Sequence, residues 1–291
     1  MRSVIRKTVI TAAGLGTRLL PATRELPKEM FPFCVYDSHG APRAKPMIQL
    51  VFESLYSHGL RNFCFVVGRR RRSVEDFFTE DHGLLSLLST TTTNNGEAEE
   101  IRQFFMMLSS SDLSFIRQAE PLGFGDAIMK SRRFVGNEDF ILHTGDNLIL
   151  SDGNRHLQRL EAAFRDHNAS VACLLDQTAN PRLYGVVTGK ELGGGCVLVD
   201  SVEEKPAAPK SNVVTIAVYA FTPQVFDYLN EAKSKVKPEK VLEHAVARML
   251  VDGHSFVGVK LVGDEKRIDI ENPMSYRTAM DSVLDRSSPS K

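Results

Sequence analysis

Residues 8–21, TVITAAGLGTRLLP, run from a short apolar segment directly into a glycine-rich turn. A strand that ends in such a turn often presents backbone N–H groups to a bound anion, because glycine lets the backbone approach closely. The pattern is not a dinucleotide fingerprint, since Leu19 stands where the third glycine belongs and three prolines (Pro21, Pro27, Pro32) prevent an immediate helix. It is not a P-loop either, because no Gly-Lys-Ser/Thr follows. The turn therefore predicts an anion site of another kind.

Two cationic side chains accompany this turn. Arg18 lies within GLGTR, and Lys28 lies further along in PKEM, residues 27–30. A guanidinium can fork two phosphate oxygens, whereas an ammonium supplies a compact positive charge. Together with the backbone amides around Gly14 and Gly16, the two cations predict half of a phosphate clamp.

The chain as a whole is electrically balanced, with 36 Lys and Arg against 36 Asp and Glu among 291 residues. We therefore expect no nucleic-acid partner and no membrane partner, and any anion binding must be local. No apolar run approaches the roughly 20 residues that span a bilayer, and no signal-peptide pattern opens the chain. The four cysteines form no C-x-x-C pair, which fits a reducing compartment better than a zinc site. These features predict a cytoplasmic protein.

The first 180 residues alternate between short apolar runs and amphipathic segments. Runs at 63–67, 139–143 and 171–175 predict buried strands, and apolar residues recur at helical spacing over 47–55. Strands with little polar alternation, separated by helices, indicate an α/β fold. We expect a Rossmann-like, mostly parallel central sheet with helices on both faces.

Ligands of such sheets bind beyond the carboxyl ends of the strands. Apolar runs end at the glycine-rich loop, at Gly145-Asp146 and at Gly68. We therefore expect these three turns to share one rim of the sheet.

The pattern changes near residue 180. Apolar segments at 186–188, 196–199 and 213–221, separated by glycine-rich turns, predict a small antiparallel elaboration in the C-terminal half. A last helix is expected after Asn272-Pro273, an N-cap residue followed by proline. The chain is thus expected to be a single domain, 1–291, with parts at 1–180, 181–270 and 271–291.

Two further segments look irregular. Residues 36–46 form a polar excursion, which we expect to be mobile. Residues 86–97, which include STTTTNNGE, are of low complexity and predict a disordered surface loop.

Residues 12–33, AAGLGTRLLPATRELPKEMFPF, closely resemble the N-terminal signature of bacterial and archaeal UTP–glucose-1-phosphate uridylyltransferases. These enzymes belong to the sugar-1-phosphate nucleotidyltransferases, which also include thymidylyltransferases. Weaker matches continue in order along nearly the whole chain, at 45–47, 118–127, 145–146, 184–185, 204–206 and 269–276. The resemblance implies that 1–180 binds the nucleotide, 181–270 binds the sugar phosphate, and 271–291 forms the C-terminal helix.

The resemblance also implies roles for individual residues. Nucleotide binding falls to Ala13, Gly14, Gly16, Thr17, Arg18, Lys28, Gln118 and Gly123. Gln118 and the backbone at Gly123 would read the base, since a side-chain amide can pair with a pyrimidine edge. Sugar-phosphate binding falls to Asp146, Gly185, Glu204 and Lys205. Mg²⁺, which prefers carboxylates together with phosphate oxygens, would be held by Asp146 and Asp269. The catalytic residues would be Arg18, Lys28, Asp146 and Lys205.

Two positions depart from the family pattern. Many uridylyltransferases carry a second aspartate where Asn147 stands, whereas thymidylyltransferases often carry asparagine. The family commonly has glycine at the position of Glu271, so glutamate there is expected to strain or crowd the backbone beside Asp269. Glu271 could instead add a carboxylate near the metal or the sugar. The run Arg69–Arg72 follows a strand, and it fits a triphosphate contact and a solvated helix start equally well.

The expected reaction joins UTP and glucose 1-phosphate to give UDP-glucose and pyrophosphate. Its nucleophile is an ionised phosphate oxygen, so no general base is required, and none of the eight histidines suggests one. The protein has to align two polyanions and neutralise charge. A thymidylyltransferase, or an enzyme for another sugar 1-phosphate, is the first alternative, and a sugar-nucleotide-binding regulatory protein is the second. Relatives imply a homo-oligomer, either a dimer or a tetramer.

Overall fold

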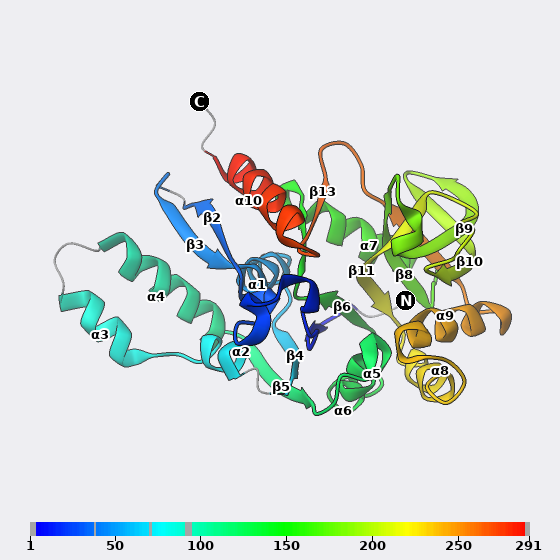
Figure 1. Cartoon of the computed structure of the whole chain (residues 1–291), viewed down its shortest axis with the longest axis horizontal. Coiled ribbons are helices and arrows are strands. Elements are labelled where there is room, and N and C mark those ends of the chain that lie inside the picture. The colour runs from blue at the N-terminus through cyan, green and yellow to red at the C-terminus, as the bar shows by residue number, and fades with distance from the viewer. Residues whose placement is uncertain (1–3, 38, 70–71, 91–94, 289–291) are drawn as a thin grey trace.

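A computed structural model gives the fold of residues 4–37, 39–69, 72–90 and 95–288, to which every structural statement below refers. These residues form a central sheet of nine strands in the order β5-β4-β1-β6-β11-β8-β12-β10-β9 (Figure 1). The strands are β1 (Lys7–Ala12), β4 (Asn62–Gly68), β5 (Asp112–Gln118), β6 (Phe140–Thr144), β8 (Val171–Gln177), β9 (Gly185–Gly193), β10 (Cys196–Glu204), β11 (Val213–Phe221) and β12 (Phe256–Lys260).

One half of the sheet is parallel. β5, β4, β1 and β6 run in the same direction, and β1 is buried from its second residue to its last. The carboxyl ends of parallel strands meet at one edge. The glycine-rich loop after β1 therefore lies beside the Gly145-Asp146 turn after β6, where the Gly145 N–H donates to the Thr11 carbonyl at 2.8 Å. The shared rim expected for these two turns is confirmed.

The other half of the sheet is mixed. β11 runs antiparallel to both β6 and β8, β12 runs parallel to β8, and β10 and β9 are antiparallel. The expectation of an α/β fold is therefore confirmed, but the sheet is mixed and not mostly parallel.

β11 does not lie where the sequence pattern predicts it. Its first residues alternate between buried and partly buried positions, which resembles a half-exposed strand, but its last four residues are all buried. This continuous apolar end fits a strand covered on both faces. β11 accordingly lies in the middle of the sheet, between β6 and β8, and not in a peripheral elaboration.

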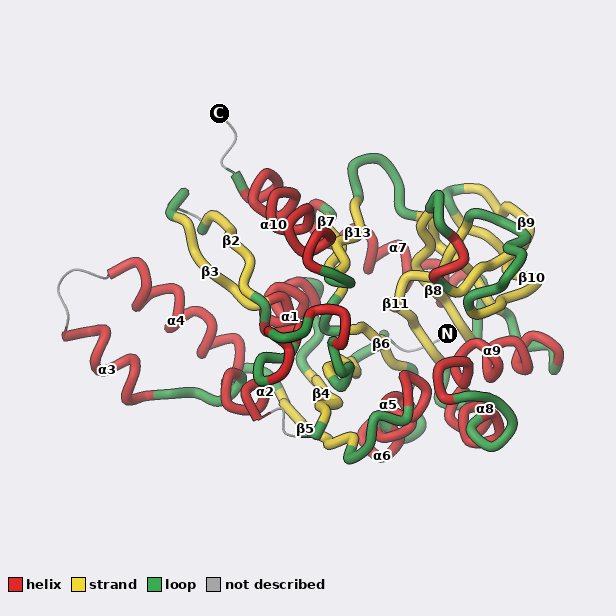
Figure 2. The backbone as a smooth tube through the Cα atoms, in the orientation of Figure 1, coloured by secondary structure: helices red, strands yellow, loops and turns green. Residues whose placement is uncertain are grey.

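Helices cover both faces of the sheet (Figures 1 and 2). Successive side chains of a strand point to opposite faces, so Ile10 and Phe65 join one apolar core, whereas Val9 and Cys64 join the other. The helices that contribute to the first core are α1 (Met47–Ser57), α2 (Arg72–Phe77), α3 (His82–Thr90), α4 (Asn95–Ser109), α7 (Arg155–Asp166) and α10 (Pro273–Ser287). Those of the second core are α5 (Gly123–Lys130), α6 (Arg132–Val135), α8 (Val225–Ala232) and α9 (Val241–Val251).

Two small antiparallel ribbons flank the sheet. β2 (Pro32–Tyr36) pairs with β3 (Pro42–Pro46), so the excursion expected at 36–46 is in part a hairpin arm. β7 (Asn147–Leu150) pairs with β13 (Lys266–Asp269), which sets Asp269 opposite Asn147. α10 begins as predicted, because the Asn272 side chain accepts hydrogen bonds from the next turn.

The prediction of a disordered loop over 86–97 is wrong for residues 86–90 and 95–97, which are helical. α3 continues to Thr90 and α4 starts at Asn95, while residues 91–94 lie outside the described part of the chain. The cause is the apolar face of α4, which packs Phe104 and Leu108 into the core. Tertiary packing of this kind outweighs weak local helix propensity.

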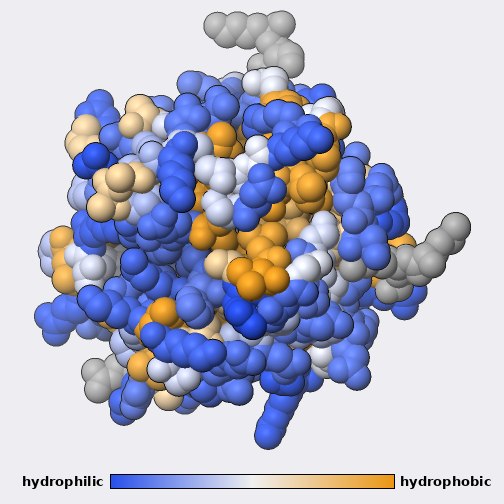
Figure 3. Space-filling model, turned by 90° about the vertical axis from the view of Figure 1, so that its right-hand side faces the viewer, coloured by the Kyte–Doolittle hydropathy of each residue, from blue (hydrophilic) through white to orange (hydrophobic). Residues whose placement is uncertain are grey.

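No helix in the described residues is long and apolar enough to cross a membrane. On the face shown in Figure 3, hydrophilic residues cover most of the surface, and hydrophobic residues gather around a hollow near its centre.

Candidate active site

The glycine-rich loop owes its sharp turn to Gly16, which has a left-handed backbone with φ 64°. A Cβ atom at Gly16 would lie 2.9 Å from Cγ2 of the buried Thr23. The Thr23 hydroxyl also donates to the Gly16 carbonyl at 2.7 Å. Only glycine combines this φ with this contact. The fold itself therefore requires glycine here, in addition to any demand from a ligand.

Lys28 and Asp146 form an ion pair where the glycine-rich loop meets the turn after β6. Burial alone would lower the pKa of Lys28, but the charges of Asp146 and Glu29 raise it above its usual value. Burial likewise tends to raise the pKa of Asp146, and Lys28 more than offsets this, so the carboxyl pKa is lowered. Both groups are thus charged. If an anion and a cation bind together, the anion can pair with Lys28 and the cation with Asp146, so that neither side chain loses its counter-charge.

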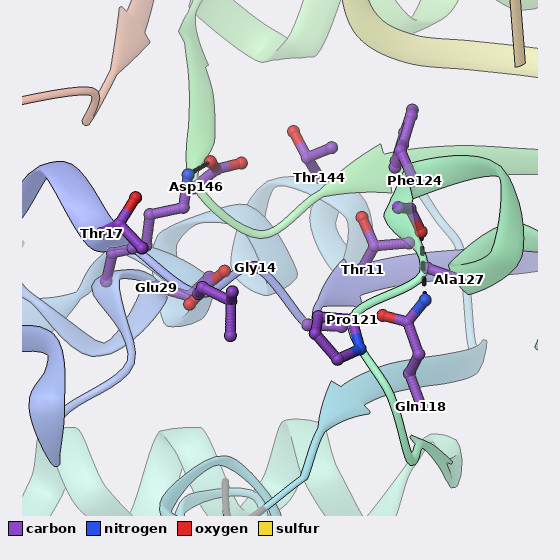
Figure 4. Close-up of a pocket in the computed structure, with 15 residues that line it drawn as sticks. Thr11, Gly14, Thr17, Glu29, Gln118, Pro121, Phe124, Ala127, Thr144 and Asp146 are labelled. Atoms are coloured by element: carbon purple, nitrogen blue, oxygen red, sulfur yellow. Dashed lines mark hydrogen bonds and ion pairs between the residues drawn. The ribbon is translucent and has the colours of Figure 1, made fainter. Parts of the chain in front are cut away.

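A cavity of about 350 Å³ extends from this ion pair toward the loop between β5 and α5; we call it the inner cavity (Figure 4). Asp146 and Thr17 lie at one end of it, and Gln118 and Pro121 lie at the other. Of the residues predicted for nucleotide binding, it is lined by Ala13, Gly14, Gly16, Thr17, Lys28, Gln118 and Gly123.

Gln118 is buried at the far end of the inner cavity. Its Nε2 donates to the Gly123 carbonyl at 3.0 Å and to Asp126 Oδ2 at 2.8 Å. Gly123 has φ 86°, and a Cβ there would lie 2.5 Å from the Pro238 carbonyl oxygen. The amide nitrogen of Gln118 therefore already donates to Gly123 and Asp126, and the amide oxygen is the atom that would accept a hydrogen bond from a ligand.

A second cavity of about 470 Å³, the outer cavity, adjoins the first. It adds Arg18, Glu204, Lys205, Asp269 and Glu271 to the lining. The two cavities share the glycine-rich loop and the Lys28–Asp146 pair. They therefore form one continuous cleft with this ion pair at its junction.

Glu204 and Lys205 enter the outer cavity from the end of β10. Lys205 Nζ lies 2.7 Å from Glu204 Oε1, and the Lys205 backbone is left-handed with φ 45°. Such a conformation costs a non-glycine residue about 1 kcal/mol or more and tends to occur at functional sites. Gly185 pairs with Glu204 across the β9–β10 ladder and lies behind its side chain, not in the cavity lining.

Asp269 reaches the junction because β13 pairs with β7, next to Asp146. Burial and the charge of Asp146 raise the pKa of Asp269 to about 7, against the opposing effect of Arg267. A divalent cation would relieve this repulsion, and two carboxylates form a donor set that fits Mg²⁺, which completes its shell with phosphate oxygens and waters. The described residues contain no cluster of three or more His, Cys, Asp or Glu for a metal held by the protein alone.

Glu271 does not have the strained backbone expected at a glycine position. Lys205 is left-handed, but Glu271 is not, and its N–H donates to Ser275 Oγ at 2.9 Å. Its carboxylate lies 3.4 Å from Arg18 NH1 and also contributes to the raised pKa of Asp269. The extra acid therefore bridges the glycine-rich loop and the metal-binding candidate.

Several lining residues had no role in the sequence analysis. Glu29 is 2% exposed within the PKEM motif, and Phe124 and Glu243 face the cleft from α5 and α9. Glu29 and Phe124 lie inside motifs that the sequence analysis already singled out, PKEM and residues 118–127, whereas Glu243 lies outside every such motif. In the arginine run, the two described residues, Arg69 and Arg72, line neither cavity, and 70–71 lie outside the described residues.

The nucleotidyl transferase family model matches residues 7–286, and the chain belongs to this family. It is 34% identical over 239 residues to a UTP–glucose-1-phosphate uridylyltransferase of Streptococcus pneumoniae serotype 4, which covers 79% of this chain and 75% of the relative. Its fold is similar to that of apo UDP-glucose pyrophosphorylase, with a TM-score of 0.83 and 27% identity over 96% of this chain and 98% of the other. A UDP-glucose pyrophosphorylase complexed with UDP-glucose gives a TM-score of 0.80 and 25% identity, with the same coverage.

Proposed function

We propose that this protein transfers a uridylyl group from UTP to glucose 1-phosphate, giving UDP-glucose and pyrophosphate. The observation that carries the proposal is the continuous cleft. The Lys28–Asp146 pair separates an inner cavity, large enough for a base, from an outer cavity that is lined by acidic residues and by Lys205. The similarity to a UTP–glucose-1-phosphate uridylyltransferase and to a UDP-glucose pyrophosphorylase supports this assignment.

UTP would occupy the inner cavity, with its triphosphate along the glycine-rich loop that both cavities share, so that it reaches Arg18 at the edge of the outer cavity. The backbone N–H groups at Ala13, Gly14, Gly16 and Thr17, with Arg18 and Lys28, would hold its triphosphate. The Gln118 oxygen would accept a hydrogen bond from the N3–H of the base. Uracil and thymine share this donor, so Gln118 does not distinguish them, and dTTP is the nucleotide that a test must include.

Glucose 1-phosphate would occupy the outer cavity, with its hydroxyls on Glu204 beside Gly185 and its phosphate on Lys205. An oxygen of this phosphate attacks the α-phosphorus of UTP, and the bond to the bridging oxygen of the β-phosphate breaks, which releases pyrophosphate. Lys28 at the junction neutralises charge on the reacting phosphates, and Arg18 holds the leaving part. No proton has to move.

Mg²⁺, when bound, would neutralise phosphate oxygens and help to align the two substrates. Asp146 and Asp269 would hold it, because their carboxylates lie close enough to perturb each other and offer hard oxygen donors. Asp146 also forms the ion pair with Lys28.

The test is to incubate the protein with Mg²⁺, UTP or dTTP, and a panel of sugar 1-phosphates, and to measure pyrophosphate. We expect the highest kcat/KM for UTP with glucose 1-phosphate. A preference for dTTP would reassign the enzyme to thymidylyl transfer. Tight UDP-glucose binding without pyrophosphate under any condition would reassign it to a regulatory role.

We further propose that residues 1–291 act as one nucleotidyltransferase domain, because strands from before and after residue 180 alternate within one sheet. Assembly into a dimer or a tetramer stays a prediction, which light scattering would test.

A further inference from the structure

Glu243 is an acidic residue of the cleft with no role in the proposed reaction so far. It lies in the first turn of α9, a helix that packs against β10, and it lines the outer cavity. Its side chain lies beside that of Glu204, since both come within 4 Å of the position that a Cβ atom at Gly185 would take. Two acids therefore meet at the sugar end of a cleft that is expected to bind polyanions.

Gly185 makes room for this pair. A Cβ atom at Gly185 would lie 2.7 Å from Thr215 Oγ1, 3.4 Å from Glu204 Oε2 and 3.7 Å from Glu243 Cγ. An added Cβ would clash with Thr215 and pack directly against both glutamates, so glycine keeps this side of the pair free of a side chain. The glycine, the end of β10 and the first turn of α9 together define the geometry of the pair.

The surroundings favour one shared proton. Burial and the negative charge of Glu204 raise the pKa of Glu243 to about 8, and Lys205 opposes this only in part. Lys205 is already paired with the other side of Glu204. The remaining titratable groups on this side are Glu239, which lines the same cavity, and the buried Tyr219 and Cys173, whose pKa values are raised.

We propose that Glu243 is a positioning residue of the sugar site, whose protonated carboxyl group donates a hydrogen bond to Glu204 and holds it as an acceptor for a sugar hydroxyl. The shared proton also leaves one negative charge, in place of two, beside the incoming phosphate. This proposal rests on the proposed function, since it assigns Glu204 to the sugar.

The proposal predicts a pH dependence confined to the sugar. Above about pH 8, loss of the shared proton leaves two carboxylates in contact, and affinity for the sugar should fall by up to about tenfold per pH unit. A nucleotide without a sugar does not reach Glu204, so its affinity should not show this fall above about pH 8. Asp269, whose pKa is raised to about 7, ionises at lower pH and acts on UDP and UDP-glucose alike.

The experiment measures calorimetric dissociation constants for UDP-glucose and for UDP between about pH 7 and pH 9, together with the KM values for glucose 1-phosphate and UTP. In the wild-type protein, the UDP-glucose dissociation constant and the glucose 1-phosphate KM should rise at high pH, while the values for UDP and UTP stay level. Glu243→Gln keeps a donor to Glu204 but cannot ionise, so it should bind UDP-glucose like the wild type near pH 7 and lose the alkaline rise. Glu243→Ala has neither a donor nor an ionisable group, so its UDP-glucose dissociation constant should lie about tenfold above the wild-type value near pH 7 and should not change with pH.

A matched control is Glu231→Gln on α8, an exposed acid paired with Lys235 at 3.3 Å, which should keep the wild-type profile. An alkaline rise that persists in Glu243→Gln, or an equal effect on UDP, would overturn the proposal. No UDP-glucose binding at any pH would overturn both this proposal and the proposed function. Binding with the expected pH profile but without pyrophosphate formation would overturn only the enzymatic function.

Discussion

The inner and outer cavities of the cleft are built in different ways. The inner cavity comes mainly from short loops that directly follow β1, β5 and β6, so most of its lining residues lie a few residues beyond a parallel strand, with Lys28 and Glu29 as exceptions. The outer cavity gathers its charged groups from the end of β10, the start of α9 and the segment after β13. A local sequence motif can therefore specify the inner cavity, whereas the outer one depends on packing between distant elements.

The largest expected effect comes from the junction of the two cavities. Asp146→Asn removes the charge that pairs with Lys28 and one of the two metal-binding candidates. We expect turnover with Mg²⁺ to fall by about 10²–10³-fold, or about 3–4 kcal/mol in the transition state, while circular dichroism stays native. Asp281→Asn, at an exposed position of α10, is the control. Near-normal turnover of the Asp146 variant would show that the junction is not the reactive centre.

Gly123→Ala tests the close approach of Gly123, in the lining of the inner cavity, to Pro238, in the segment that leads into α9. Its Cβ would meet the Pro238 carbonyl oxygen at 2.5 Å, at φ 86°. We expect a loss of about 2–3 kcal/mol in the free energy of unfolding, from backbone strain of about 1 kcal/mol plus the clash. Gly253→Ala has nearly the same φ, 87°, with nothing within 4 Å of its Cβ, so it should show the strain alone. Equal urea midpoints for the two variants would contradict the clash.

A residue outside both cavities is expected to make the folded protein less stable at low pH. His156 of α7 is buried, and burial lowers its pKa to about 3. Its folded-state pKa lies below the usual 6.5, so the unfolded chain takes up the proton first and stability falls as the pH drops from 6.5 toward 3. At about pH 5 this costs about 2 kcal/mol. Urea titrations at about pH 5 and about pH 7 should show that His156→Leu removes this loss in the free energy of unfolding. If the loss is unchanged in the variant, it comes from other groups, such as His143, whose pKa is lowered to about 4.

Gly185→Ala should affect only the outer cavity. The added Cβ would lie 2.7 Å from Thr215 Oγ1, and relief of this clash would shift the β9 backbone that pairs with Glu204. We expect the KM for glucose 1-phosphate to rise about tenfold, equivalent to about 1.4 kcal/mol, while the KM for UTP is unchanged. The double variant with Thr215→Ala should recover part of this loss. A parallel rise in the UTP KM would mean that the two cavities are not independent.

The smallest effect is expected for Glu271→Gly, which restores the glycine common in the family. It frees Arg18, which is 64% exposed, from a 3.4 Å contact. Exposed ion pairs contribute about 0–1 kcal/mol, so UTP should bind up to about fivefold tighter in calorimetry without Mg²⁺. Weaker UTP binding would show that Glu271 supports the nucleotide site and does not compete with it.

Much of the inner cavity was predictable because the relevant constraints are local. The left-handed Gly16 and the apolar β1 before it are visible in a single stretch of sequence, and parallel strands place their carboxyl ends together as a rule. The N-cap of α10 was equally local, since Asn272 bonds to the N–H groups that follow it. Such features need no knowledge of the rest of the chain.

Other features were missed because long-range packing overrides the local pattern. β11 alternates at its start, yet its pairing with β6 and β8 places it at the centre of the sheet. The polar segment around residue 95 becomes helical because the apolar face of α4 packs into the core. Glu243 shows no motif, and only the packing of α9 on β10 brings it to Glu204.

The sequence by itself determined the family, the glycine-rich loop and the charged residues that accompany it, because these depend on backbone freedom and side-chain chemistry within short segments. Only the tertiary structure decided how the charges are paired. Lys28 is held by Asp146, Arg18 by Glu271, and Glu204 by Lys205. Coulomb energies depend on distance and burial, and those are set only when elements far apart in the chain pack together.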